Sequence, residues 1–194
     1  MSEIEASVGR MRYGFVMPFG GAADVAEHAV MAESSGWDAI FDWEAVWGDD
    51  AWVALIAAAM VTDHIRLGTM LTPIPRMRPW DLASRASSLD RLSHGRVILG
   101  AGLGALHEGW TAFEADEGRR VRVEKMDEGL STKHFDICVE GEFYGADAGE
   151  RDLKAWAEAG ATWWIEGAWR LENTEAGRAE LARRIQAGPP DFRR

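Results

Sequence analysis

Residues 65–104 read IRLGTMLTPIPRMRPWDLASRASSLDRLSHGRVILGAGLG, and this run decides the fold. A short apolar strand ends at Gly68 and Thr69 and continues into a loop marked by prolines. An amphipathic helix is predicted over Pro79–Ser93, followed by a second short strand, Arg96–Gly100, that ends in a glycine-rich loop. The run is therefore a βαβ unit, and parallel α/β proteins bind ligands at such strand ends.

The same alternation of strand and helix extends on both sides of this run. The sequence predicts strands at Met11–Phe19, Trp37–Trp43, Ile65–Leu71, Arg96–Gly100, Phe135–Glu140 and Thr162–Glu166. It predicts helices at Ala22–Ser35, Asp50–Thr62, Pro79–Ser93, Glu150–Ala159 and Glu175–Gln186, and a further helix that starts near Arg119. Such alternation requires parallel strands and right-handed crossovers, so the fold is either a (β/α) barrel or a doubly wound open sheet.

Size and composition limit the function classes. The chain has 194 residues, of which 47% are hydrophobic, and we expect a flexible leader over residues 1–10 and one domain over residues 11–194. The net charge of −11 argues against a nucleic acid or an anionic membrane as partner, because either requires basic patches. No apolar run reaches the roughly 18 residues of a membrane span.

The single cysteine, Cys138, cannot form an intramolecular disulfide, and its apolar surroundings predict a small buried side chain. A reducing cytoplasm fits this cysteine usage. The five histidines show no metal-ligand spacing among themselves or with Cys138, so we expect no metal site.

Two segments carry a resemblance to a known family. RLGTMLTPIPRMRPW at 66–80, followed by LDRLSHGRVILGAGLG at 89–104, resembles the luciferase-like monooxygenase superfamily, and most closely its flavin- and deazaflavin-dependent oxidoreductases. MRYGFVMP at 11–18 and WAEAGATWWIE at 156–166 resemble the first and last strands of that family. The resemblance implies an α/β fold, a TIM-type (β/α) barrel that holds the ring of coenzyme F-420 or FMN at its C-terminal mouth and acts on a small organic substrate.

The chain departs from the family pattern in its second half. Strands five and six have no counterpart, and the join falls near Leu130–Ser131, so we expect a barrel truncated to about six βα units. Residues 11–130 then form the first half and residues 131–194 the last two units. The strands Val97–Leu99 and Phe135–Val139 either pair and close a six-stranded barrel or leave a gap.

A gap in the barrel would expose two apolar strand edges. Such edges pair readily with a second chain, and we therefore predict a homodimer. The apolar helix Asp50–Thr62 offers a separate helix-to-helix interface.

The ends of the third and fourth strands supply the predicted cofactor contacts. Small residues there let the backbone approach the edge of a ring. The resemblance places Thr69 beside the ring and an unusual peptide or bulge around Met70 and Leu71. It also places Ala101 and Gly102, in the glycine-rich loop, against the ring. Without the resemblance, these segments are an ordinary strand end and a weak glycine motif.

Acidic residues at three strand positions are the candidates for proton chemistry, since carboxylates at a barrel mouth can orient a substrate or move protons. We expect Asp42 to neighbour the cofactor and Glu44 to carry protons, although a solvated loop would explain both. Glu166 ends the last strand and is expected to face the mouth as a second catalytic residue, with a structural ion pair as the alternative. Four tryptophans are candidates for the pocket rim: Trp43, Trp47, Trp110 and Trp169.

Two functions compete at this stage. The first is a flavin- or deazaflavin-dependent oxidoreductase of the luciferase-like type. The second is a shortened, non-catalytic relative, a dimeric protein that binds flavin weakly or not at all. A purely structural or interaction domain is a third reading.

Overall fold

A computed structural model gives the structure of the chain and describes residues 11–104, 109–112, 115, 118–127, 136–144 and 153–190. The predicted leader and the expected join near Leu130–Ser131 lie outside the described residues. Six strands form one sheet in the order β5-β3-β2-β1-β8-β7, and all neighbours are parallel. The strands are β1 (Arg12–Val16), β2 (Ala39–Asp42), β3 (Arg66–Thr69), β5 (Val97–Ile98), β7 (Cys138–Gly141) and β8 (Trp163–Gly167).

The remaining two strands continue the third and fifth strands beyond the sheet. β4 (Thr72–Pro73) pairs in parallel with β6 (Ala101–Gly102), so the ends of the two segments stay together. The pairing confirms the predicted parallel strands, and among the described residues the main sheet has the six strands that were predicted. Most strands are shorter than predicted, β8 keeps its predicted length but is shifted by one residue, and the helices match the predicted ranges closely.

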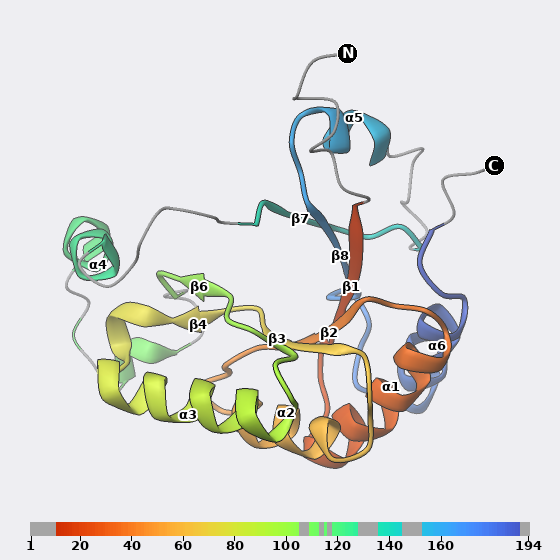
Figure 1. The fold of residues 1–194 in the computed structure, drawn as a ribbon, viewed down its shortest axis with the longest axis horizontal. Coiled ribbons are helices and arrows are strands. Elements are labelled where there is room, and N and C mark those ends of the chain that lie inside the picture. The colour runs from red at the N-terminus through yellow and green to blue at the C-terminus, as the bar shows by residue number, and fades with distance from the viewer. Residues whose placement is uncertain are drawn as a thin grey trace.

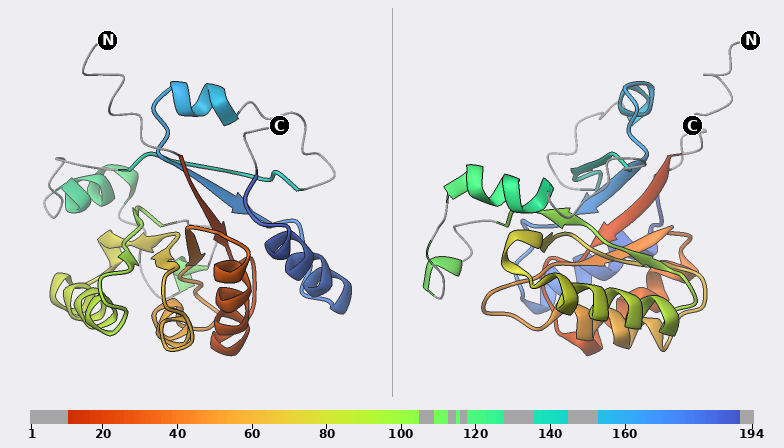
Figure 2. Two further views of the ribbon diagram at one scale, coloured as in Figure 1. Left: turned by 45° about the vertical axis from the view of Figure 1, so that its right-hand side comes forward. Right: turned by 60° about the vertical axis from the view of Figure 1, so that its left-hand side comes forward.

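Four helices lie side by side along one face of the sheet (Figure 1). They are α1 (Ala22–Ser34), α2 (Ala51–Ala59), α3 (Pro79–Leu92) and α6 (Glu175–Gln186). α4 (Gly118–Asp127) lies beyond β4 and β6, next to the short 3-10 helix η1 (Ile74–Arg76), and a second 3-10 helix, η2, covers Trp110–Ala112. α5 (Leu153–Glu158) lies at the end of the sheet where β8 begins (Figure 2).

Local signals set the helix boundaries near the site. The Asp50 side chain accepts hydrogen bonds from the backbone N–H groups of Trp52 (2.8 Å) and Val53 (3.2 Å) and so caps the start of α2. At the other end of α2, the Arg96 guanidinium donates to the carbonyl oxygens of Ala59 (3.1 Å) and Thr62 (2.9 Å). These contacts satisfy backbone groups that a helix end leaves unpaired.

The sheet separates two hydrophobic clusters. The larger cluster fills the space between the strands and the helices and includes Phe15, Leu55 and Trp164. The smaller cluster lies on the opposite, inner face, where Phe41 and Trp163 meet edge to face with their ring centroids 6.0 Å apart. The inner face is therefore filled by side chains, as in TIM-type barrels.

Glycine makes room for the inner aromatic ring. A Cβ on Gly14 would lie 2.4 Å from the Phe41 ring, and one on Gly68 would lie 2.3 Å from it. Phe41 therefore sits across β1 and β3, and only glycine fits beneath it on either strand.

The described strands do not close a barrel. β5 and β7 form the two edges of the sheet, and no described strand joins them, so of the two expected arrangements the gap is the one present. Cys138, on edge strand β7, is exposed, so its predicted burial is wrong; among the described residues, no strand pairs with the outer edge of β7.

Two helices each leave apolar side chains exposed. In α3, Leu89 is 1% exposed, whereas Leu92 is 41% exposed. α2 buries one broad face and exposes Val53, Ile56 and, just beyond its end, Met60. Among the described residues, no helix combines the length and apolar character needed to cross a membrane.

Candidate functional site

A pocket of about 330 Å³ opens at the carboxyl ends of β1 and β2. Phe19, Trp43 and Trp47 supply its aromatic walls, and Asp42 and Asp49 supply its carboxylates. This volume is at the low end of the range for small-molecule sites. The position is the expected one, since parallel β/α proteins bind ligands outside the carboxyl ends of their strands.

Asp42 is the most perturbed acid of this pocket. It ends β2, is 9% exposed, and accepts a hydrogen bond from the backbone N–H of Trp43 at 2.9 Å. Burial is the main cause that raises the pKa of Asp42 to about 6; the hydrogen bond from the Trp43 N–H opposes the rise, and the negative charges of Asp49 and Asp50 add to it. Asp42 can therefore hold or release a proton near neutral pH.

Glu44 lines a second pocket, of about 230 Å³, together with Asp49 and Asp50. The indole N–H of Trp52 donates to its Oε1 at 3.0 Å, and the Thr72 hydroxyl forms a second hydrogen bond with its side chain. Burial raises the pKa of Glu44, while these two hydrogen bonds oppose the rise. The geometry suits a carboxyl group that exchanges a proton, which is the role expected for it.

The structure brings the predicted cofactor-binding residues together. Asp42 and Thr69 are register partners on β2 and β3, and the N–H of Met70 donates to the Asp42 carbonyl at 2.7 Å. The peptide between Met70 and Leu71 is cis, which confirms the unusual peptide expected there.

Leu71 and Gly102 are in close contact within this group. A Cβ on Gly102 would lie 2.4 Å from the Leu71 side chain, which is 38% exposed. Ala101, next to Gly102 in β6, is half-buried and pairs with Thr72. Four of the predicted contacts, Met70, Leu71, Ala101 and Gly102, thus lie in two adjoining segments.

Thr69 is placed differently from the expectation of a direct contact. It is 1% exposed, and its hydroxyl accepts hydrogen bonds from the Gly100 N–H (3.1 Å) and from the Thr72 hydroxyl (2.9 Å). The side chain is therefore used within the chain, where it holds the end of β3 against the segment that leads to β6.

Glu166 does not face the mouth, and that expectation is wrong. It is fully buried on the helix-facing side of β8, opposite Phe15 of β1. Its carboxylate accepts from the backbone N–H groups of Phe143 (2.7 and 2.8 Å) and Tyr144 (3.2 Å). Burial raises the pKa of Glu166, and these hydrogen bonds oppose the rise.

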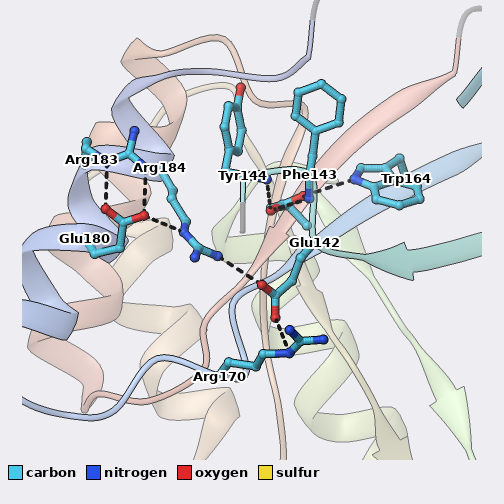
Figure 3. A network of polar contacts seen from close by, with 9 residues as sticks. Glu142, Phe143, Tyr144, Trp164, Arg170, Glu180, Arg183 and Arg184 are labelled. Carbon is cyan, nitrogen blue, oxygen red and sulfur yellow. Dashed lines mark hydrogen bonds and ion pairs between the residues drawn. The ribbon is translucent and has the colours of Figure 1, made fainter. Parts of the chain in front are cut away.

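Glu166 belongs instead to a structural network (Figure 3). Trp164 donates to its Oε2 at 3.3 Å, and the neighbouring Glu142 contacts both Arg170 (3.8 Å) and Arg184 (3.5 Å). The network ties the segment after β7 to α6. A tryptophan lies on each face of WWIEG, so the sequence did not indicate which face packs against the helices and which lines the inside.

Two of the predicted rim tryptophans pack against each other. Trp43 and Trp169 meet edge to face with centroids 5.8 Å apart, and Trp169 donates to the carboxylate of Glu140. Trp47 is 73% exposed at the pocket, and the side chain of Trp110 lies outside the described set. The sequence analysis did not identify Glu140 and Thr72. For Glu140, the only signal was the alternation of side chains between the two faces of β7 (Cys138–Gly141).

Among the described residues, no group of three or more His, Cys, Asp or Glu side chains could hold a metal ion. The arrangement suits a flat aromatic ligand with a polar edge, because the walls are aromatic and Asp42 can donate or accept a hydrogen bond there. No lysine or arginine is among the residues that line the two pockets, so these pockets offer no cationic side chain to a phosphate group.

Sequence comparisons match between half and two thirds of this chain. The sequence model of luciferase-like monooxygenases matches residues 7–128. A putative coenzyme F420-dependent oxidoreductase of Mycobacterium tuberculosis is 37% identical over 105 residues, which cover 52% of this chain and 30% of that protein. An F420-dependent glucose-6-phosphate dehydrogenase of Intrasporangium calvum is 37% identical over 142 residues, which cover 64% of this chain and 42% of that protein.

Solved structures extend the likeness to nearly the whole chain. The monooxygenase RslO1 of Streptomyces bottropensis aligns with a TM-score of 0.53 and 22% identity, over 93% of this chain and 68% of that one. An F420-dependent secondary alcohol dehydrogenase in complex with an F420–acetone adduct aligns with a TM-score of 0.54 and 17% identity, over 94% and 66%. At these identities the likeness shows the fold alone, which is an α/β fold of the TIM-barrel type.

This chain aligns with only part of each relative's length, so a relative's activity cannot be assigned to this chain from the alignment alone. The alignment with the M. tuberculosis protein spans only about a third of that protein's length. The family match itself covers well over half of this chain and contains both pockets and all the predicted cofactor contacts. The chain belongs to the luciferase-like monooxygenase family.

Proposed function

We propose that the chain binds the tricyclic ring of a deazaflavin or flavin and acts as an oxidoreductase or monooxygenase on a small organic molecule. The observation that carries this proposal is Asp42, a buried acid with a raised pKa that lines an aromatic pocket at the carboxyl end of a parallel strand. Coenzyme F-420 is favoured over FMN because relatives at 37% identity are named as F420-dependent.

The residues present fit the ring of such a cofactor. Asp42 would hydrogen-bond its polar edge, and Met70, Leu71, Ala101 and Gly102 would lie against its face. They do not fit its phosphate-bearing tail, since acidic side chains surround both pockets. When bound, the ring would accept or donate a hydride. Glu44 is the proposed proton carrier, because its pocket adjoins that of Asp42 through Ala45, Gly48 and Asp49.

The direct test is a binding titration of the purified chain with coenzyme F-420 and, separately, with FMN. We expect saturable binding of one cofactor per chain. Asp42→Asn should weaken binding at least severalfold, because the amide cannot change its protonation state with the ring. Asp90→Asn, at an exposed position on α3, should leave the affinity unchanged. Equal affinity in the two variants would contradict the placement of the ring at Asp42.

A second candidate function is a shortened, non-catalytic relative. The unpaired edges of the sheet favour it, since β5 and β7 lack barrel neighbours among the described residues. Failure of both cofactors to bind would support this candidate.

We also propose that the chain forms a homodimer in the cytoplasm. Val53, Ile56 and Met60 expose an apolar stripe along α2, with 55%, 39% and 67% exposure. The stripe is spaced as a helix-to-helix contact requires. The net charge of −11 does not favour nucleic acid or an anionic membrane as a partner, and a reducing compartment fits the single cysteine.

A further inference from the structure

One buried tryptophan hydrogen-bonds directly to the proposed proton carrier. The indole Nε1 of Trp52 donates to Oε1 of Glu44, and the two atoms lie 3.0 Å apart. Trp52 is 3% exposed and belongs to the larger hydrophobic cluster, whereas Glu44 is half-buried and lines the pocket of about 230 Å³. The bond therefore joins a side chain of the core to a carboxyl group at the edge of a cavity.

The same tryptophan is also held through its backbone at the start of α2. Its backbone N–H donates to Oδ1 of Asp50 at 2.8 Å, and Oδ2 of Asp50 lies 3.3 Å from Nη1 of Arg85 on α3. Because the Trp52 ring packs within the core, its indole N–H has a set direction. Glu44, in the loop that precedes α2, meets this fixed donor, and its carboxyl group is thereby held in one place.

A second buried tryptophan shows that an indole N–H does not need a carboxylate as its partner. Trp37 is 4% exposed, and its Nε1 donates to the backbone carbonyl oxygen of Ile185 at 2.8 Å. A carbonyl group satisfies a buried indole without any change of charge. Trp52 instead has an acceptor that can gain or lose a proton. Hydrogen bonds to ionised acceptors are stronger than those between neutral groups, so the Trp52 bond strengthens when Glu44 ionises.

We propose that Trp52 is a positioning residue for Glu44: its indole N–H holds the carboxyl group at the pocket and favours the ionised, proton-accepting form. The contact is a property of the free protein, and only its use in a reaction rests on the proposed function. Other charged groups also face Glu44, namely Asp49 and Asp50 in the shared pocket and Arg85 from α3. Burial raises the pKa of Glu44, and the Trp52 bond opposes that rise.

NMR of the wild-type protein gives the first test and needs no change at Trp52. We expect the Trp52 indole N–H and the Glu44 carboxyl carbon to titrate with one midpoint, because the strength of their hydrogen bond follows the charge on Glu44. The Trp37 indole, which is bonded to a carbonyl group, should not follow that titration in the same spectra. Glu44→Gln should abolish the Trp52 titration, and it also assigns the carboxyl resonance.

A substitution at Trp52 tests whether the donor acts on Glu44. Trp52→Phe keeps an aromatic ring in the core and removes the N–H, so the Glu44 midpoint should rise by roughly 1 pH unit. Trp37→Phe is the matched control, since it removes the same donor from an equally buried tryptophan and should leave the Glu44 midpoint unchanged. A tryptophan with a merely structural role would lower stability in either variant and move neither midpoint.

Two outcomes overturn the role of Trp52. It is wrong if the Trp52 indole does not titrate with Glu44, or if Trp52→Phe leaves the Glu44 midpoint where Trp37→Phe leaves it. This failure is separate from that of the proposed function, which binding of coenzyme F-420 or FMN tests. A shared titration in a protein that binds neither cofactor keeps the role of Trp52 and removes the reaction. Cofactor binding without a shared titration keeps the proposed function and removes the role of Trp52.

Discussion

Phe41 shows how single residues shape the inside of this fold. Its ring spans the inner face of β1 and β3 and meets Trp163 of β8, so it fills part of the interior that the sheet encloses. The glycines at 14 and 68 are the complement of that ring, because each would place a Cβ within 2.4 Å of it. Phe41 and the two glycines that lack a side chain beneath it therefore pack as one unit.

A methyl group at Gly68 should disturb this unit. Gly68→Ala would place Cβ 2.3 Å from the Phe41 ring and 3.3 Å from Ile98, so we expect a loss of about 1–3 kcal/mol in the free energy of unfolding. Urea denaturation measures it. In the double variant with Phe41→Leu the loss from Gly68→Ala should shrink. Strictly additive losses would show that the ring is not the obstacle.

The buried carboxyl of Asp42 should make stability depend on pH. Its pKa is raised from 3.8 to about 6, so the folded chain holds this proton more tightly than the unfolded chain. Stability from this group is therefore complete at low pH and declines as pH rises through about 6. Asp42→Asn removes the decline and should stabilise the protein by on the order of 2 kcal/mol at pH 8.

The comparison at low pH is the control for this prediction. Near pH 3, below both the unfolded value of 3.8 and the folded value of about 6, the difference between Asp42→Asn and the wild-type protein should fall close to zero, since the carboxyl is then largely neutral in both states. A variant that is less stable than wild type at pH 8 would contradict the raised pKa.

Residue types alone indicated Asp42 and Glu44, but not how each residue is oriented. Thr69 was expected to contact the ring and instead bonds within the chain, because a hydroxyl at a buried strand end finds backbone partners first. Glu166 was expected at the mouth and instead binds two backbone N–H groups on the other face. When large apolar side chains lie on both faces of a strand, the sequence does not indicate which face of the sheet each residue occupies.

At the scale of elements, Arg96 joins the end of α2 to the strand that follows α3. Its guanidinium donates to the carbonyl oxygens of Ala59, Thr62 and Ile65, to the Thr62 hydroxyl and to the Ser93 carbonyl. Arginine supplies the five donors that this arrangement uses, whereas lysine has three. The loop between α2 and β3 is therefore held in place by the side chain of Arg96, the residue just before β5.

Arg96→Lys should weaken this junction although it keeps the charge. Unsatisfied carbonyl groups at the end of α2 should lower the free energy of unfolding by about 1–3 kcal/mol. Faster hydrogen exchange of the amides of Met60 and Val61 would locate the effect. Arg66→Lys, at an exposed position of β3, is the matched control and should change neither quantity. Equal behaviour of the two variants would contradict the role of Arg96.

The order and ranges of elements were predictable because each helix carries its own periodicity and its own start and stop residues. α6 runs from Glu175 to Gln186 as predicted, between a Thr174 cap and a glycine. The strands were predicted too long, since apolar residues continue past the last ladder bond. The break between β3 and β4 depends on backbone geometry at Met70–Leu71, and only the family resemblance pointed to it.

At the scale of the whole molecule, the described strands form a TIM-type sheet with two unpaired edges. Whether β5 and β7 would meet was not decidable from sequence, because closure depends on strand tilt and stagger. The edges and the apolar stripe on α2 are separate reasons to expect association, and they can be told apart by substitution on the helix.

A charge in the α2 stripe should prevent dimer formation if α2 forms the interface. Met60→Glu places a carboxylate at a position that is 67% exposed in the single chain, so a dimer in the wild-type protein should become a monomer of 21.4 kDa. Light scattering after size exclusion measures the mass. Val30→Glu, on α1, should leave the dimer intact. A Met60→Glu dimer would place the contact at the sheet edges instead.

The central claim is that the carboxyl ends of β2 and β3 receive a tricyclic redox ring, and the indole N–H resonances of the ten tryptophans test it most directly. On titration with coenzyme F-420 or FMN, the signals of Trp43 and Trp47 should shift to saturation, while that of Trp156, on α5 at the end of the sheet where β8 begins, stays in place. No shift with either cofactor, or a shift confined to Trp156, would contradict the account.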